Sequence, residues 1–244
     1  MSKRVLGMIL SCAVLVGMLA APVQGKKASK SPKWGDTNSP LRPGASLGGY
    51  CTFNFVFYTP GTAKAPAKGY IGTAGHCTDE IGEVVENPGL GPVGKVVYDS
   101  DLAEPASGVD FSLIELDTNI IGQTNPEVLV WGGPTGFVTT EDFAVGDQVD
   151  VYGYGMLVGE NEQTRRRYGA LVSWTDNEYQ ADMPAVNGDS GAPLLHHETG
   201  AALGIISRYG IGVQVPSTDQ GPLMTWILEE LETSGFNVRL ATVK

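Results

Sequence analysis

The sequence has few of the residues on which several protein classes depend. Its 244 residues include three histidines, three cysteines and 16 basic residues against 27 acidic ones, a formal net charge of -11. Such a charge does not favour binding to nucleic acid or to anionic membranes. There is no His-Glu-x-x-His motif, and the neighbouring His196 and His197 cannot easily present one chelating face. We therefore expect neither a metal nor another cofactor, and a metal hydrolase is a remote alternative.

The one long apolar run lies at the start of the chain. Lys3 and Arg4 precede 17 uncharged, mainly apolar residues, 5–21, and a small-residue exit that ends at Gly25. This arrangement is typical of a secretory signal peptide, residues 1–25, and its length is at the short limit for a membrane span. A membrane anchor is the alternative. We expect cleavage after Gly25, secretion, no stable membrane association afterwards, and a mature net charge of -13 (16 - 2 = 14 basic residues against 27 acidic).

Removal of the signal leaves two cysteines, Cys51 and Cys77. In an oxidising compartment they can close a loop of about 26 residues and stabilise the fold by about 3 kcal/mol. The sequence therefore predicts a disulfide between them, and two buried thiols are the alternative.

Residues 26–46 are rich in Lys, Ser, Pro and Gly and predict a flexible tail, because they hold too few apolar side chains to order themselves. Beyond them, short apolar runs such as 51–58 and 111–116 are separated by Gly, Pro, Asn and Asp. Regular short strands with such punctuation predict an all-β sandwich or barrel. Only the end has a helical pattern. The stretch from 119 to about 146 has little pattern and is the best candidate for a connection between two halves.

Three short segments carry residues suited to nucleophilic catalysis. In Gly-Asp-Ser-Gly-Ala-Pro, residues 188–193, glycines around Ser190 let two amides point at one place, as an oxyanion requires. In Thr-Ala-Gly-His-Cys, His76 follows a strand. In Val-Asp-Phe-Ser-Leu, Asp110 begins a strand, where burial is costly unless an imidazole N–H pairs with its carboxylate. A turn serine, a structural histidine and a solvated turn aspartate are the alternatives.

Together these segments, in the order His, Asp, Ser, resemble the three catalytic blocks of the chymotrypsin-like (trypsin-fold) serine peptidase family, and secreted bacterial members in particular. The resemblance covers roughly residues 47–231. It implies one peptidase domain, 47–244, of two antiparallel Greek-key β-barrels, about 47–137 and 138–222, with a C-terminal helix at about 223–234. The site would lie in the cleft between the barrels.

The resemblance also implies a role for each residue. His76 would be the general base, Asp110 would orient it, and Ser190 would attack the scissile carbonyl. The amides of Gly188 and Ser190 would form the oxyanion hole. The predicted disulfide matches the one that typically braces the histidine loop in this family.

The sequence departs from the family at the start of the chain. No Ile-Val-Gly-Gly is present there, so a new N-terminal amine is not expected to pair with Asp189. One of Arg165, Arg166 and Arg167 could balance this carboxylate, as internal arginines do in bacterial relatives. A solvated basic loop is the alternative.

The resemblance places the floor of the specificity pocket near Pro184, with Ala185 beside it, and puts Ser207 on the strand that lines the substrate. No acid stands at that floor, and Asp182 is two residues away. We therefore expect a small or apolar side chain at P1, the substrate residue on the acyl side of the scissile bond.

The leading hypothesis is a secreted, monomeric serine endopeptidase that acts on polypeptides through an acyl-enzyme. A catalytically silent relative that binds a partner is the alternative, although all three triad positions hold the required residue. An α/β-hydrolase would need glycine in place of Ala192 and a histidine far downstream of Ser190. Only His196 and His197 follow, and we expect them in an exposed loop.

Overall fold

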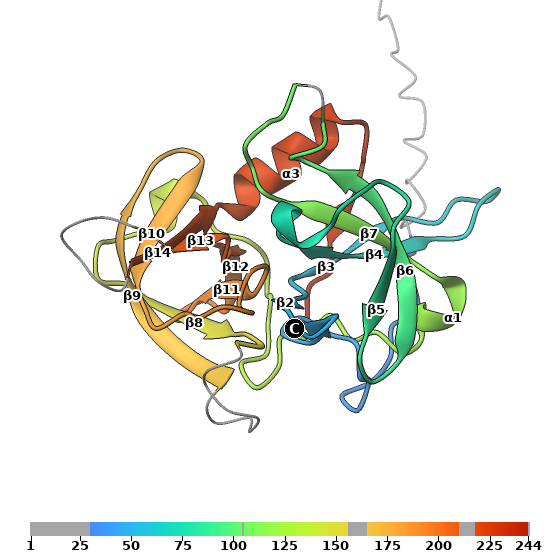
Figure 1. Ribbon diagram of the computed structural model, residues 1–244, viewed down its shortest axis with the longest axis horizontal. Coiled ribbons are helices and arrows are strands. Elements are labelled where there is room, and N and C mark those ends of the chain that lie inside the picture. Colours follow the sequence, from blue (N-terminus) through green and yellow to red (C-terminus); the bar gives the residue numbers. More distant parts are fainter. Residues whose placement is uncertain (1–29, 104, 156–164, 210–217, 244) are drawn as a thin grey trace, which may run out of the picture.

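The computed structural model describes residues 30–103, 105–155, 165–209 and 218–243. Two antiparallel β-sheets stand side by side, each curled toward a barrel, and a helix near the C-terminus spans the space above them (Figure 1). The predicted fold class, two Greek-key barrels with a C-terminal helix, is confirmed. The expected signal peptide lies outside the described residues. Within the described ranges, no helix is both long and apolar enough to cross a membrane.

In the first barrel the strands are hydrogen-bonded in the order β15-β3-β4-β7-β6-β5. Alternate apolar side chains fill its interior, and Ile71 of one strand pairs with Ile114 of its neighbour in the middle of the sheet. The elements are β3 (Val56–Thr59), β4 (Lys68–Thr73), β5 (Val84–Asn87), β6 (Gly91–Asp99), β7 (Ser112–Leu116) and β15 (Arg239–Leu240), with β1 (Ser46–Leu47), β2 (Cys51–Thr52), η1 (Gly75–Cys77) and α1 (Thr118–Ile121) beside them.

In the second barrel the order is β12-β11-β8-β9-β10-β14-β13, drawn in yellow to red in Figure 1. Its core is a separate cluster that includes Val149, Leu171, Tyr179 and Leu194, each at most 1% exposed. The elements are η2 (Thr140–Asp142), β8 (Gln148–Tyr152), β9 (Arg166–Trp174), β10 (Glu178–Asp182), β11 (Pro193–His196), β12 (Ala201–Ile205), β13 (Arg208–Tyr209) and β14 (Thr218–Pro222).

Helix α3 (Met224–Thr233) agrees with the predicted helix within a residue at each end. Met224, Ile227 and Leu231 are buried in a cluster that also holds side chains of both barrels, so the helix joins the two cores. The chain then returns to the first barrel as β15, where Arg239 pairs with Tyr58. This strand was not predicted, because two residues are too short to show an alternation.

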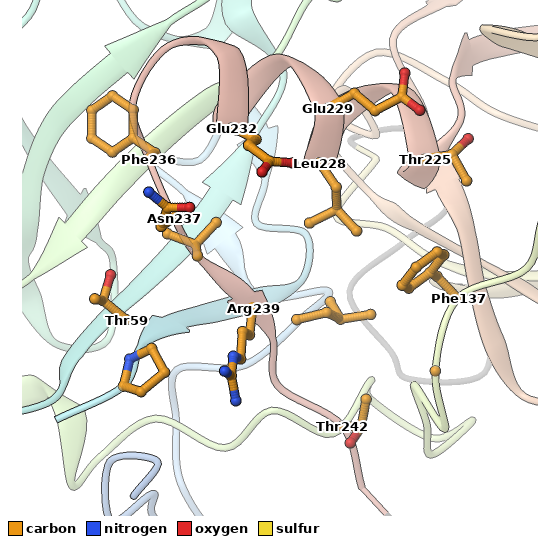
Figure 2. A pocket seen from close by; sticks show the side chains of 14 residues that line it. Thr59, Phe137, Thr225, Leu228, Glu229, Glu232, Phe236, Asn237, Arg239 and Thr242 are labelled. Carbon is orange, nitrogen blue, oxygen red and sulfur yellow. The ribbon is translucent and has the colours of Figure 1, made fainter. Parts of the chain in front are cut away.

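A cavity of about 890 Å³ lies between α3 and β15 (Figure 2). Leu228 and Glu232 of the helix, Phe236 after it, and Phe137 from the connection between the barrels line it. None of the predicted site residues lines this cavity. The candidate catalytic residues lie instead between the two sheets.

The structure differs from the expectation of a flexible tail over residues 30–46. Leu41 is fully buried in the first core, and the N–H of Gly35 donates to the carbonyl oxygen of Thr124 at 2.8 Å. The N–H of Gly44 donates to Phe53 at 2.8 Å. This segment is ordered by contacts with residues that are distant in the sequence, and its composition does not reveal such contacts.

Candidate active site

His76 is held by the first barrel next to the carboxylate of Asp110. His76 lies in the single turn η1 after β4, and its Nδ1 is 3.0 Å from each carboxylate oxygen of Asp110. The backbone N–H of His76 also donates to Oδ1 at 3.0 Å. A Cβ on Gly75 would lie 3.1 Å from this oxygen, so glycine leaves room for the carboxylate. Asp110 has a φ of +54°, a left-handed conformation that aspartate tolerates better than most residues.

The electrostatics of this pair favour an ionised carboxylate and a basic imidazole. Burial opposes ionisation of Asp110, but hydrogen bonds from His76 and Ser207 outweigh burial and lower its pKa below the usual value. The hydrogen bond to Asp110 raises the pKa of His76, with further contributions from Asp101 and Asp99. These contacts favour a proton on Nδ1, which would leave Nε2 able to accept one.

Ser207 has a different contact from the predicted one. Its hydroxyl donates to Oδ2 of Asp110, and the side chain is 5% exposed. The hydroxyl thus supports the carboxylate from the second barrel.

Ser190 lies on a tight loop between β10 and β11. The N–H of Asp189 donates to Val186 at 3.0 Å, and the N–H of Ala192 donates to Asp189 at 2.8 Å. Gly191 has a φ of +87°, and a Cβ there would lie 2.2 Å from the carbonyl oxygen of Thr52. Glycine is required here because the loop packs directly on the backbone of the first barrel.

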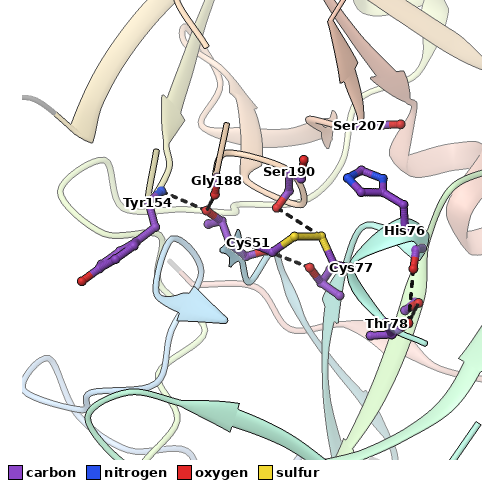
Figure 3. Close-up of a disulfide and its surroundings, with 12 residues drawn as sticks. Cys51, His76, Cys77, Thr78, Tyr154, Gly188, Ser190 and Ser207 are labelled. Carbon is purple, nitrogen blue, oxygen red and sulfur yellow. Dashed lines mark hydrogen bonds between the residues drawn. A yellow bond between two sulfur atoms is a disulfide. The ribbon is translucent and has the colours of Figure 1, made fainter. Parts of the chain in front are cut away.

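This packing brings Ser190 to the residue that follows His76. The carbonyl oxygen of Ser190 accepts the N–H of Thr52 at 2.8 Å and lies 3.9 Å from Sγ of Cys77. Figure 3 shows Ser190 and the His76 ring above the disulfide. Across the described residues, no hydrogen bond joins Oγ of Ser190 to His76. Such bonds are often loose in unliganded enzymes and tighten when substrate binds.

Two amides of the loop are available to a ligand. Among the hydrogen bonds of the described residues, none is donated by the N–H of Gly188 or of Ser190. The hydroxyl of Thr52 donates to the carbonyl oxygen of Gly188 at 2.7 Å and accepts the N–H of Tyr154 at 2.9 Å (Figure 3). Thr52 therefore orients this loop. The sequence patterns did not predict this role of Thr52, and its position directly after Cys51 was the only signal.

The predicted disulfide between Cys51 and Cys77 is confirmed, with the two Cα atoms 6.2 Å apart. It ties β2 to the turn that carries His76. The sulfur atoms also lie within 4.8 Å of a ring nitrogen of His76, a grouping that would suit a metal ion if the thiols were free. Disulfide sulfurs are not thiolate ligands, so this group is a brace and not a metal site.

The carboxylate of Asp189 is balanced by Arg167, one of the three arginines considered for this role. Both residues are buried, and NH1 and NH2 of Arg167 lie 2.5 Å from Oδ2 and Oδ1 of Asp189. The N–H groups of Gly155 and Val186 also donate to this carboxylate, at 2.9 and 2.8 Å. Arg165 and Arg166 instead stack on the rings of Tyr154 and Trp131.

The segment expected to form the specificity pocket is in contact with this ion pair. The carbonyl oxygen of Pro184 accepts NH1 of Arg167 at 2.9 Å, and Ala185 is half-buried. Asp182 is exposed at the end of β10. The guanidinium of Arg167 therefore contacts both the segment that holds Pro184 and the loop that holds Ser190.

Of the two remaining histidines, His197 lies in an exposed turn as expected, whereas His196 does not. His196 ends β11 and is 4% exposed, with Nε2 3.3 Å from Asp147. His197 is half-exposed, with Nδ1 2.7 Å from Asp150. Both rings contact aspartates of the second barrel and not the Ser190 loop. The sequence pattern did not predict the burial of His196, because β11 extends one residue beyond its apolar residues.

Comparisons with known proteins agree with this geometry. The family model described as Trypsin matches residues 61–221. A protease from Thermobifida fusca, Protease A, is 21% identical with a TM-score of 0.56, and the protease NAPase of Nocardiopsis is 20% identical with a TM-score of 0.57. A chymotrypsin from Cellulomonas bogoriensis is 19% identical with a TM-score of 0.56. Each alignment covers 83% of this chain and 99% of the other. No curated protein sequence matches the chain.

The two barrels and the helix that joins their cores have the fold of the chymotrypsin-like serine proteases. The chain belongs to the trypsin family, since that family's model spans most of both barrels. At this level of identity the solved structures establish the fold alone.

Proposed function

We propose that this chain is a secreted serine endopeptidase that hydrolyses polypeptides through an acyl-enzyme. The observation that carries the proposal is the ring of His76, anchored by two 3.0 Å contacts to a buried Asp110 on the barrel wall that faces Ser190. An imidazole oriented in this way is suited to take a proton from a hydroxyl beside it.

The first half of the reaction forms the acyl-enzyme. As Oγ of Ser190 attacks the carbonyl carbon, Nε2 of His76 takes the hydroxyl proton. Asp110, which stays ionised, stabilises the imidazolium. The oxyanion forms near the unengaged amides of Gly188 and Ser190. His76 then gives its proton to the leaving amine as the C–N bond breaks.

The second half repeats these steps with water. Water gives a proton to Nε2 of His76 and adds to the acyl carbon, and the same two amides stabilise the second oxyanion. Collapse of this intermediate breaks the bond to Ser190, whose Oγ recovers the proton from His76. The product is a free carboxylate and the enzyme is restored.

Secretion is supported by the signal-like residues 1–25 and by the disulfide, since disulfides persist mainly in oxidising compartments. The excess of acidic residues supports a soluble enzyme that does not bind nucleic acid. We expect the acting unit to be a monomer without a metal or other cofactor.

The proposal is tested with an organofluorophosphonate, which labels an activated serine covalently. We expect labelling of the wild-type protein and none of Ser190→Ala. Ser112→Ala is a matched control, because Ser112 is a buried serine in β7 whose hydroxyl contacts Thr78 and not the triad. The readout is the mass of the intact protein before and after treatment.

Folding must be established in the same samples by circular dichroism. A folded wild-type protein that takes no label at pH 8 would contradict the proposal. That result would favour the alternative of a catalytically silent, partner-binding member of the family.

A further inference from the structure

The second barrel contains a buried carboxylate that the proposed mechanism does not use. Asp219 lies in β14 and is 2% exposed. Among the described residues, no hydrogen bond or ion pair to its carboxylate is formed. The pKa of Asp219 is raised to about 7, mainly by burial and also by the charges of Asp189 and Asp182, while Arg167 opposes the rise. An unpaired carboxylate in a protein interior is costly, so its presence calls for a partner.

The strand that carries Asp219 runs between the two segments expected to hold the substrate. On one side Asp219 pairs with Ala181 of β10, the strand that leads to Pro184. On the other side β14 pairs with β13, and the N–H of Ser207 donates to the carbonyl oxygen of Gln220 at 3.2 Å. Asp219 is thus flanked by both walls of the expected specificity pocket.

The direction of the side chain follows from burial along the paired strands. Ala181 and Asp219 are buried, whereas Asp182 is exposed and Gln220 is partly exposed. Because side chains alternate across a sheet, Asp219 faces into the barrel and Asp182 faces out. Asp219 is therefore the inward-facing acid of this strand pair.

Among the described residues, Arg167 forms no hydrogen bond or ion pair with Asp219, and four of its five N–H groups are directed to other acceptors. NH1 of Arg167 contacts Asp189 and Pro184, NH2 contacts Asp189, and Nε donates to the carbonyl oxygen of Arg165 at 3.4 Å. The hydroxyl of Tyr179 donates to Ile205 at 2.9 Å. Within the described part of this barrel end, Arg167 is paired with Asp189, and Asp219 has no cation of its own.

We propose that Asp219 is the specificity-determining residue of this site and that it receives the ammonium or guanidinium group of a P1 Lys or Arg. The inference rests on the proposed peptidase function. It replaces the expectation of a small or apolar P1 residue, which considered only the floor near Pro184. The P1 side chain of the substrate would supply the cation that pairs with ionised Asp219. When Asp219 is protonated, the pocket is neutral and accepts an uncharged side chain.

The test compares two peptides that differ only at P1, one with lysine and one with norleucine, which has the same carbon chain without the charge. At pH 8 we expect kcat/KM for lysine to exceed that for norleucine by about tenfold to a hundredfold, the range of a charged hydrogen bond. Asp219→Asn should abolish this ratio by lowering kcat/KM for the lysine peptide. Asp182→Asn, the outward-facing acid two residues before Pro184, is the matched control and should keep the ratio.

The pH dependence adds a readout that a structural role would not change. In the wild type, the ratio should rise through pH 7 as Asp219 ionises, and in Asp219→Asn it should be flat. The other ionisable groups that interact electrostatically with Asp219 are Asp182, Asp189, Arg167 and Tyr179. All of them remain in that variant, so a flat ratio assigns the pH dependence to Asp219.

Fluorophosphonate labelling separates this inference from the proposed function. If the wild type is labelled but does not prefer lysine, or if Asp219→Asn keeps the preference, Asp219 does not set specificity and the peptidase proposal stands. If the folded wild type takes no label, both fail. Should Asp219→Asn not fold, protection of the wild type from labelling by benzamidine, a P1 cation mimic, is compared with neutral benzyl alcohol, and equal protection would overturn the inference.

Discussion

The two barrels hold their halves of the site by different means. In the first barrel, the disulfide between Cys51 and Cys77 is a covalent brace for the turn that carries His76. In the second, the Ser190 loop rests on the buried ion pair of Arg167 and Asp189. A covalent brace acts mainly on the unfolded chain, whereas each member of a buried ion pair is costly without the other. The second barrel should therefore be more sensitive to a single substitution.

Arg167→Met is expected to have the largest effect. It leaves the carboxylate of Asp189 buried without its cation, which should lower the free energy of unfolding by about 3–5 kcal/mol. Arg166→Met is the matched control, because Arg166 is an exposed neighbour that stacks on Trp131 and should cost at most about 1 kcal/mol. Urea denaturation followed by circular dichroism measures both.

The double variant Arg167→Met with Asp189→Asn keeps this prediction testable if the single variant does not fold. It removes both charges, so it should recover part of the lost stability. Equal stability of Arg167→Met and Arg166→Met would show that the second barrel does not depend on the ion pair.

Removal of the disulfide by Cys51→Ser with Cys77→Ser comes next. The two cysteines are 26 residues apart, and opening a loop of that length should lower the free energy of unfolding by about 3 kcal/mol. Reduction of the wild type by dithiothreitol under the same denaturant series should give the same loss and serves as the control. A double variant as stable as the oxidised wild type would show that the disulfide does not stabilise the first barrel.

The smallest effect is expected from Asp101→Asn in the first barrel. Asp110 is the main cause of the raised pKa of His76, and Asp101 and Asp99 add to it. Loss of the Asp101 charge should lower the pKa of His76, so the neutral base should persist to lower pH. We expect the acid limb of kcat/KM to move down by about a few tenths of a pH unit.

The matched control for this shift is Asp79→Asn. Asp79 is an exposed carboxylate three residues after His76 that does not contribute to the raised pKa. A shift of the limb to higher pH in Asp101→Asn, or an equal shift in both variants, would contradict the electrostatic account.

Much of the site was predicted from the sequence because its residues stand in short local patterns. The glycines beside Ser190, the strand before His76 and the apolar run after Asp110 are all visible within a few residues. The disulfide was predicted because only two cysteines, Cys51 and Cys77, lie beyond the expected signal peptide. The ordered structure of residues 30–46 was not predicted, because Leu41 and Gly35 form hydrogen bonds with residues more than 50 positions away in the sequence, Gln123 and Thr124.

The contacts between the barrels were equally out of reach of local patterns. Thr52 holds the Ser190 loop across 136 residues, and Ser207 reaches Asp110 across 97. A serine or threonine has no periodicity that would reveal such a partner. The choice of Arg167 over its two neighbours also required the fold, since only one of three consecutive side chains faces inward in β9 and meets Asp189.

The sequence by itself determined the fold class, the disulfide and the three residues that carry the proposed chemistry, because strand patterns, cysteine counts and turn glycines are local properties. Only the tertiary structure decided which arginine balances Asp189, which hydroxyl supports Asp110 and that Asp219 faces inward without a cation. Burial and charge balance depend on residues from several strands at once.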